Sequence, residues 1–303
     1  MDTLPVNLAG IKLRNPTMLA AGILGMSGDL MIRVWEAGAG AVVSKSIGLK
    51  ARLGYPNPSV IQVDCGLLNA IGLSNPGIHE FAGEIKKVKE SGAPIIVSVY
   101  GYSPEEYLEV AGAAEDYGAD AVELNVSCPH VGYTGSEIGQ NPSLLKEVVA
   151  EVKGGIGIPV FVKLTPNVSD IVKVSEAAVD AGADVITAIN TVRAMAIDIE
   201  TMHPILGNRF GGLSGPAIKP IAMRCVYEVS EKLDVPVIGC GGILDWRDAV
   251  EFMLAGASAV QIGSAIMVKD LDVFKSIVEG IKTYLETKGF SRVDEIVGLS
   301  HRR

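Results

Sequence analysis

Four copies of one short pattern constrain the fold of this chain more than any other feature. They read AGAGAVV from Ala37, YGADAVEL from Tyr117, AGADVIT from Ala181 and AGASAVQI from Ala255. In each copy a glycine follows a helical segment, and an apolar run comes soon after. A glycine in that place is typical of a helix end that leads through a short loop into a strand. The copies lie 64 to 80 residues apart, which fits pairs of βα units rather than a solenoid.

A proline precedes several of the expected strands, as in PIIV from Pro94, PVFV from Pro159 and PVI from Pro236. Together the two patterns predict strands at Thr17–Gly22, Ala41–Ser46, Ile95–Tyr100, Ala121–Ser127, Val160–Leu164, Val185–Asn190, Val237–Gly239 and Ala259–Gly263. Helical patterns lie between them. This alternation predicts an α/β fold, a (β/α)8 TIM barrel that forms a single domain over residues 1–303. An open doubly wound sheet is the alternative.

Helix starts and two further segments complete this prediction. Ser103-Pro104, Asn141-Pro142 and Asp245 are typical of the first residues of helices. Residues 4–16 predict a short N-terminal β-hairpin before the first strand. Residues 49–76 form an extended loop after the second strand, and we expect it to be functional because it is too long for an ordinary βα connection.

Composition excludes several classes of protein. The net charge of −9 and the lack of a dense Lys/Arg cluster argue against nucleic-acid binding. The N-terminus lacks the features of a signal peptide, and no run approaches the roughly 18 apolar residues of a membrane span, so we expect a cytoplasmic protein that crosses no membrane. The four cysteines, Cys65, Cys128, Cys225 and Cys240, form no C-x-x-C pair. We therefore expect no metal site, iron–sulfur cluster or disulfide framework in this chain.

Polar residues and glycines gather where the expected strands end. They are Lys45, Ser46, Ser98, Asn125–Cys128, Lys163, Asn190, Thr191, Gly241, Gly242, Gly263 and Ser264. Lysine and asparagine are poor strand residues, and the active sites of barrels form at the carboxyl ends of the strands. Lys163 alternates with Phe161 and therefore points inward, where a buried lysine needs an anionic partner.

The pairs Gly241-Gly242 and Gly263-Ser264 follow the seventh and eighth expected strands, which is where many barrels bind phosphate. Backbone N–H groups there, with a helix N-terminus, can hold the phosphate of a substrate or of a flavin. No G-x-G-x-x-G motif follows a strand and opens a helix. We therefore expect no dinucleotide-binding half.

Cys128 stands where the fourth expected strand stops, because Pro129 cannot donate to a sheet. A loop from Gly132 to Gly135 follows. A thiol beside an amide such as Asn125 can take up a proton if its pKa lies near the working pH. Taken alone, the stretch favours a buried structural cysteine.

Several segments together resemble class 1 dihydroorotate dehydrogenases, and most of all the catalytic subunit of the NAD-linked class 1B type. The similar segments lie between residues 6 and 267 and read NAIGLSNPG from Asn69, ELNVSCP from Glu123, VKLTPN from Val162, AINT from Ala188, GGLSGPAIKP from Gly211 and GCGG from Gly239. The combination is far more specific than any one motif.

The resemblance implies a cofactor, a substrate and a base. FMN would lie over the strand ends, lined by Ala21, Lys45, Ser46, Ser98, Asn125, Lys163, Ile189 and Gly215, with its phosphate on Gly241, Gly242, Gly263 and Ser264. Dihydroorotate would contact Lys45, Asn69, Ala70, Ile71, Gly72, Leu73, Asn125, Asn190 and Thr191. Cys128 would be the catalytic base.

Three positions depart from the family pattern. His130 follows Cys128-Pro129 where an asparagine is usual, and Cys-Pro-His also resembles dihydropyrimidine dehydrogenases. Ser98 stands where an asparagine often meets the flavin, and Ala21 where a serine is common.

The resemblance also implies a partner. In a class 1B enzyme a homodimer of catalytic subunits binds two electron-transfer subunits that carry FAD and a 2Fe-2S cluster and pass electrons to NAD. The activity implied is oxidation of (S)-dihydroorotate to orotate in pyrimidine biosynthesis. The alternatives are a dihydropyrimidine dehydrogenase-like flavoenzyme, a fumarate-linked dihydroorotate dehydrogenase, a non-redox barrel for a sugar phosphate, and a binding barrel without catalysis.

Overall fold

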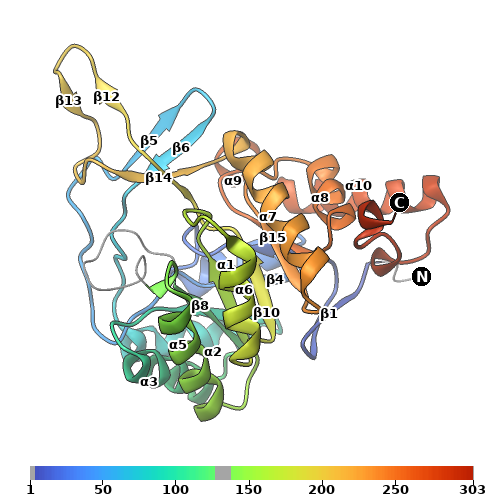
Figure 1. The fold of residues 1–303 in the computed structure, drawn as a ribbon, viewed down its shortest axis with the longest axis horizontal. Coiled ribbons are helices and arrows are strands. Elements are labelled where there is room, and N and C mark those ends of the chain that lie inside the picture. Colours follow the sequence, from blue (N-terminus) through green and yellow to red (C-terminus); the bar gives the residue numbers. More distant parts are fainter. Residues whose placement is uncertain (1–3, 127–137, 303) are drawn as a thin grey trace.

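Eight parallel strands close into a barrel (Figure 1). The computed structural model describes residues 4–126 and 138–302, so Cys128 and His130 lie outside the described residues. In barrel order the strands are β3 (Thr17–Leu19), β4 (Ala41–Val43), β7 (Ile95–Val99), β8 (Ala121–Asn125), β9 (Val160–Leu164), β10 (Val185–Ala188), β15 (Val237–Cys240) and β16 (Ala257–Ile262). β16 pairs with β3, so the predicted barrel is confirmed and the open sheet is excluded.

Several strands end earlier than the sequence suggests. β3 stops at Leu19 and β4 at Val43, whereas Gly22 and Ser46 were the expected ends. The chain beyond these strands turns to line a cavity, and Ala21 and Lys45 are among the residues that do so. Residues that line a ligand site leave the hydrogen-bonded ladder, which explains the shorter strands.

Helices surround the barrel, as expected for a parallel sheet that is buried on both faces. They are α1 (Gly28–Glu36), α2 (Ile78–Glu90), α3 (Pro104–Asp116), α5 (Pro142–Gly155), α6 (Ile171–Asp180), α7 (Lys219–Lys232), α8 (Trp246–Leu254), α9 (Ile266–Lys269) and α10 (Asp272–Lys288). Within the described ranges, none of these helices has the length and apolar character needed to cross a membrane.

The predicted helix boundaries are confirmed by their capping contacts. The Ser103, Asn141 and Asp245 side chains accept hydrogen bonds from backbone N–H groups in the first turns of α3, α5 and α8. In the recurrent pattern, Gly38 and Gly256 follow α1 and α8 with φ angles of 115° and 114°. This is a conformation that glycine adopts without strain.

An N-terminal hairpin closes the bottom of the barrel. β1 (Val6–Leu8) and β2 (Ile11–Leu13) pair antiparallel, which confirms the predicted hairpin. Leu8 and Leu13 are buried in one cluster with side chains of the barrel interior, including Ala41 and Ala121 at the first positions of their strands. Because the amino ends of the strands are covered by apolar packing, the carboxyl ends remain for a ligand site.

The extended segment after β4 is partly ordered as a sheet that sequence patterns did not predict. β5 (Val60–Val63) and β6 (Gly66–Asn69) join β14 (Gly211–Ser214) and β11 (Val192–Ala194) in the antiparallel order β11-β14-β6-β5. A hairpin of β12 (Ile197–Asp198) and β13 (His203–Pro204) projects near this sheet (Figure 1, upper left). The strands of this sheet are only three or four residues long, and β6 and β14 contain glycine, which explains the omission because strand patterns need longer alternating runs.

Candidate active site

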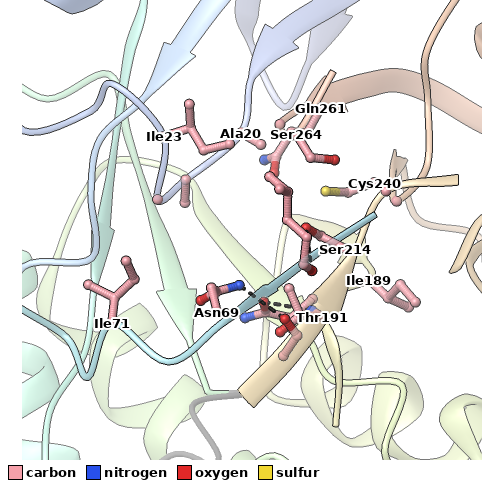
Figure 2. Close-up of a pocket in the computed structure, with 18 of the residues that line it drawn as sticks. Ala20, Ile23, Asn69, Ile71, Ile189, Thr191, Ser214, Cys240, Gln261 and Ser264 are labelled. Atoms are coloured by element: carbon pink, nitrogen blue, oxygen red, sulfur yellow. Dashed lines mark hydrogen bonds between the residues drawn. The ribbon is translucent and has the colours of Figure 1, made fainter. Parts of the chain in front are cut away.

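A cavity of about 440 Å³ lies between the carboxyl ends of the barrel strands and the sheet β11-β14-β6-β5. Figure 2 shows Cys240 and Gln261 from the barrel, and Asn69 and Ser214 from the added sheet, around one space. The cavity is therefore built by two layers of the fold. This position agrees with the usual place of barrel active sites.

Most of the predicted site residues line this cavity. They are Ala21, Lys45, Ser46, Asn69, Ala70, Ile71, Gly72, Leu73, Asn125, Lys163, Ile189, Asn190, Thr191, Gly215, Gly241, Gly242, Gly263 and Ser264. Among the described residues, Ser98 is not part of the lining; it is fully buried, and its Oγ lies 2.9 Å from Ser46 Oγ. Ser98 therefore supports a cavity residue, and the structure does not place it where it would touch a flavin.

Asparagine side chains form a hydrogen-bonded wall along one side of the cavity. Asn125 Nδ2 donates to Ser46 Oγ at 2.8 Å, and Asn190 Nδ2 donates to Asn125 Oδ1 at 3.3 Å. The Thr191 N–H donates to Asn190 Oδ1 at 2.8 Å. These bonds orient amide groups from two strand ends, and such groups can both donate to and accept from a polar ring.

The segment from Asn69 to Leu73 forms a second part of the lining and is held by Asn75. Asn75 is 5% exposed; its Nδ2 donates to Leu73 O at 2.8 Å and to Tyr100 Oη at 2.9 Å. Its Oδ1 accepts from the N–H groups of Gly48 at 3.3 Å and Gly77 at 2.8 Å. Leu73 has a φ of 57°, which is unfavourable for a residue with a side chain. The contacts of Asn75 compensate for this strain.

Arg52 holds the same segment from outside the cavity. Its Nε donates to Gly72 O at 2.7 Å, and its Nη1 donates to Tyr102 Oη at 3.2 Å. The backbone N–H of Tyr55 donates to Ile71 O at 3.1 Å. The segment that the sequence assigns to substrate is therefore fixed at three successive residues, Ile71 to Leu73.

The floor of the cavity contains the buried lysine that the sequence predicted to point inward. Lys163 Nζ donates to Gln261 Oε1 at 2.6 Å and lies 3.7 Å from Glu123 Oε1. Burial opposes the charge of Lys163, but Cys240 and Glu123 raise its pKa above the ordinary value. Burial also raises the pKa of Cys240, so its thiol is protonated near neutral pH. The charge partner of Lys163 is the carboxylate of Glu123, whose Oε1 lies 3.7 Å from Nζ. The expectation of an anionic partner is thus confirmed.

Sequence reasoning missed several residues of this site. Gln261, Cys240, Gly212, Ser214 and Met267 line the cavity, and Glu123 lies beneath it. A signal was present for two of them, because Glu123 in AVELN and Gln261 in AVQIG are polar residues inside apolar strands. A polar side chain that a strand pattern directs into a barrel needs a partner there.

Gly215, Gly241, Gly242 and Gly263 form a cradle of glycines in the lining of the cavity. Gly242 has a φ of 72°, and a Cβ there would lie 2.6 Å from Lys219 Cβ and 2.9 Å from Gly215 O. At Gly263, by contrast, a Cβ would meet Ala20 Cβ at 3.5 Å, which is an ordinary contact. The fold itself thus requires glycine at position 242. At position 263 the fold would accept a larger residue, and a ligand close to the backbone would explain why glycine is present. Both features fit a bound phosphate.

These features define a class: a parallel (β/α)8 barrel whose strand ends combine a glycine cradle with a lysine- and amide-lined cavity. The family model described as dihydroorotate dehydrogenase matches residues 3–285, and the chain belongs to this family. Dihydroorotate dehydrogenases are in general flavin-dependent oxidoreductases.

Curated relatives cover nearly the whole chain. The catalytic subunit of dihydroorotate dehydrogenase B (NAD(+)) from Methanocella arvoryzae is 52% identical over 296 residues, which are 98% of this chain and 97% of that protein. The corresponding subunit from Pyrococcus abyssi is 53% identical over 299 residues, which are 98% of this chain and 99% of that protein. The name "catalytic subunit" implies that these relatives work with a partner subunit.

A solved structure supports the fold. The crystal structure of DHODH from Eimeria tenella in complex with ferulenol matches with a TM-score of 0.88 at 22% sequence identity. The match covers 100% of this chain and 90% of that one. At this identity the likeness concerns the barrel architecture alone.

Proposed function

We propose that this chain is the catalytic subunit of an FMN-dependent dihydroorotate dehydrogenase that oxidises (S)-dihydroorotate to orotate in pyrimidine biosynthesis. The observation that carries the proposal is the convergence of Lys45, the asparagine wall, the 69–73 segment and the glycine cradle on one cavity. The names of the curated relatives support the same activity.

The described residues fit FMN as the cofactor. Gly263 lines the cavity and a Cβ there would make only ordinary contacts, so its backbone can lie close to a phosphate, and the buried, positively charged Lys163 supplies a cation on the cavity floor. When bound, FMN would supply the hydride-acceptor chemistry that no amino-acid side chain provides. The residues of this chain would bind the phosphate, place a positive charge beside the ring system and exclude water.

The side chains of the cavity suit dihydroorotate. The Lys45 ammonium would bind the substrate carboxylate, while Asn69, Asn125 and Asn190 would orient the ring by hydrogen bonds to its N–H and C=O groups. Tyr107 Oη donates to the backbone oxygen of Asn125 at 3.0 Å and so holds that strand end in place. Orientation of this kind lowers the entropic part of the barrier.

Cys128 would act as the base, as the sequence resemblance implies, although it lies outside the described residues. Its thiolate would take the proton from C5 of dihydroorotate, while the hydrogen at C6 leaves with its electron pair. The C5–C6 double bond of orotate forms in place of the two C–H bonds. A thiol with an ordinary pKa of about 8.5 makes the rate rise with pH.

The electrons would pass to NAD through a partner subunit. We propose that this partner carries FAD and a 2Fe-2S cluster and that two copies of it bind a dimer of this chain. The described residues contain no group of three or more His, Cys, Asp or Glu placed to hold a metal. The cytoplasmic location expected from the sequence stays a prediction.

Anaerobic titration of the purified chain tests the proposal. We expect a visible flavin spectrum that dihydroorotate bleaches and dihydrouracil does not. Bleaching by dihydrouracil would favour the dihydropyrimidine dehydrogenase-like alternative, in which His130 marks a different substrate. A colourless protein that binds no added FMN would contradict the proposal and favour a non-redox phosphate barrel.

A matched pair of variants tests the base in the same assay. We expect Cys128→Ala to lower the rate of flavin reduction by about two orders of magnitude or more, because general-base catalysis contributes on this scale. Cys128→Ser keeps a side chain that can exchange a proton, so we expect a smaller loss at high pH. A wild-type rate in Cys128→Ala would rule out this role.

A further inference from the structure

We propose that Glu123 is a positioning residue of this site: its buried carboxylate holds the Lys163 ammonium charged and oriented at the cavity floor. The inference rests on the proposed function, because it concerns the charge that Lys163 presents to the flavin. Lys163 itself is one of the residues that line the cavity, and Glu123 is not among the described lining residues. Glu123 therefore acts on a ligand only through the lining residues that it contacts, Lys163 and Gln261.

The contacts of Glu123 form a closed network across four strands. Gln261 Nε2 donates to Glu123 Oε2 at 2.6 Å, and Thr187 Oγ1 donates to the same oxygen at 2.9 Å. Gln261 Oε1 accepts from Lys163 Nζ at 2.6 Å. Since one end of the Gln261 amide meets the carboxylate, its oxygen must face the ammonium. Glu123 thereby fixes Lys163 twice, directly by charge and indirectly through Gln261.

Because the pair of Lys163 and Glu123 is buried, the loss of either charge should strongly affect the site. The side chains of Lys163 and Glu123 are 5% and 0% exposed. Removal of one member of a buried pair leaves an uncompensated charge and is strongly destabilising, whereas removal of both members is often nearly neutral. Glu123 Oε1 is buried and accepts no hydrogen bond from the described residues, so its main interaction there is the ammonium 3.7 Å away. A purely structural role would not require this oxygen to face Lys163.

Loss of the Glu123 carboxylate should lower the pKa of Lys163, so that the ammonium can lose its proton as the pH rises. The titratable groups that act on Lys163 are Glu123 from β8 and Cys240 from β15. In Glu123→Gln the carboxylate is gone and the Cys240 thiol is neutral near neutral pH, so burial is left to lower the pKa of Lys163. The ammonium would then persist at low pH and become a neutral amine as the pH rises.

The reduction potential of bound FMN reports this change. In Glu123→Gln at low pH the lysine charge is no longer balanced by the carboxylate, so we expect a potential above that of the wild type. At high pH the lysine is neutral, and we expect a potential below that of the wild type. The difference should fall by one proton step over the pH range in which Lys163 of the variant loses its proton. We also expect FMN binding to weaken by roughly tenfold across this range, as judged by fluorescence quenching of FMN.

Three control variants separate this role from simple stabilisation. Glu123→Asp keeps the charge, and we expect a pH-independent difference in potential. Thr187→Val removes a neutral hydrogen bond to the same carboxylate oxygen, and we expect wild-type pH behaviour. Glu123→Gln/Lys163→Met removes both charges, and we expect recovered thermal stability without recovery of the potential.

The outcomes decide the proposal. If the potential of Glu123→Gln follows that of the wild type in parallel at every pH, Glu123 does not control Lys163 and the inference is wrong. If Glu123→Gln does not fold, the two other variants decide the proposal. A difference in FMN potential that changes with pH in Glu123→Asp, or a double variant with the FMN potential of the wild type, would overturn the inference. Wild-type protein that binds FMN but is not reduced by dihydroorotate would instead contradict the proposed function, and the pH test would remain valid.

Discussion

Asn75→Ala is expected to damage both stability and substrate binding, because this one side chain organises the 69–73 segment. The substitution removes hydrogen bonds to Leu73 O, Tyr100 Oη and the N–H groups of Gly48 and Gly77. A typical intramolecular hydrogen bond contributes about 1 kcal/mol net. Loss of all four therefore costs about 4 kcal/mol, which is a large part of the roughly 5–15 kcal/mol that stabilises a protein.

The magnitude can be checked by thermal unfolding. An unfolding entropy of about 2 cal/mol/K per residue gives roughly 0.6 kcal/mol per degree for a chain of this length. A loss of about 4 kcal/mol then lowers Tm by roughly 6 °C. Because Leu73 is released from its strained φ of 57°, we also expect the KM for dihydroorotate to rise by about tenfold.

Tyr100→Phe is the matched control. It removes only one of the four bonds, and we expect a cost of about 1 kcal/mol and a Tm shift below about 2 °C. Burial raises the pKa of Tyr100 to about 12, so its hydroxyl stays protonated over the whole working range and the comparison is independent of pH. Equal Tm values for the two variants, or an unchanged KM in Asn75→Ala, would refute the reasoning.

Three further predictions concern the cradle, an ion pair and the floor. Gly263→Ala should leave the melting temperature of the FMN-free protein unchanged but weaken FMN binding, whereas Gly242→Ala should lower both because its Cβ would clash with the chain. Burial opposes ionisation of Asp248, but hydrogen bonds from Lys219 and two backbone N–H groups lower its pKa. The ionised carboxylate therefore stabilises the folded protein at a pH above the pKa of the unfolded state, and this contribution is lost as the pH falls through the lowered pKa of the folded state. Asp248→Asn should thus cost about 1 kcal/mol in urea unfolding at neutral pH and nothing in strong acid, and an equal cost at both would contradict the pairing. Lys163→Ala should lower FMN retention or the rate of flavin reduction, and unchanged values of both would show that Lys163 is structural.

The barrel could be predicted because its signals are local and repeated. A glycine after four of the helices, a proline before several strands and apolar runs of suitable length indicated all eight strands without any knowledge of contacts. The same periodicity placed Lys163 on the inner face, and burial of that side chain confirms it. The alternation of side chains in a strand is a geometric property, so it can be counted along the sequence.

The added sheet and the partner of Lys163 could not be predicted in this way. β6 pairs with β14, and Asn69 lies opposite Gly212, more than a hundred residues along the chain. Strands of three or four residues that pair over such distances leave no periodic pattern. Likewise, alternation directs Glu123 inward, but only the closed barrel brings it beside β9 and β16.

Ser98 illustrates the limit of motif transfer. The family pattern associates its position with the flavin, but a serine side chain is shorter than the usual asparagine. In this structure its hydroxyl meets Ser46 Oγ at 2.9 Å, and Ser46 in turn accepts from Asn125. The position thus supports the asparagine wall through Ser46. A role copied from a family must therefore be tested against the size of the residue that is present.

On six of the eight barrel strands, a step of two residues along the strand separates an apolar packing position from a polar one. The apolar interior layer contains Ile96, Ala121, Phe161, Val185, Ile238 and Ala259. Two residues later on the same strands stand Ser98, Glu123, Lys163, Thr187, Cys240 and Gln261. Since residues i and i+2 share a face of a strand, both layers point into the barrel. The apolar layer, sealed below by the hairpin, excludes water from beneath the polar layer, and this is why the pairing of Glu123 with Lys163 can control the charge at the cavity floor.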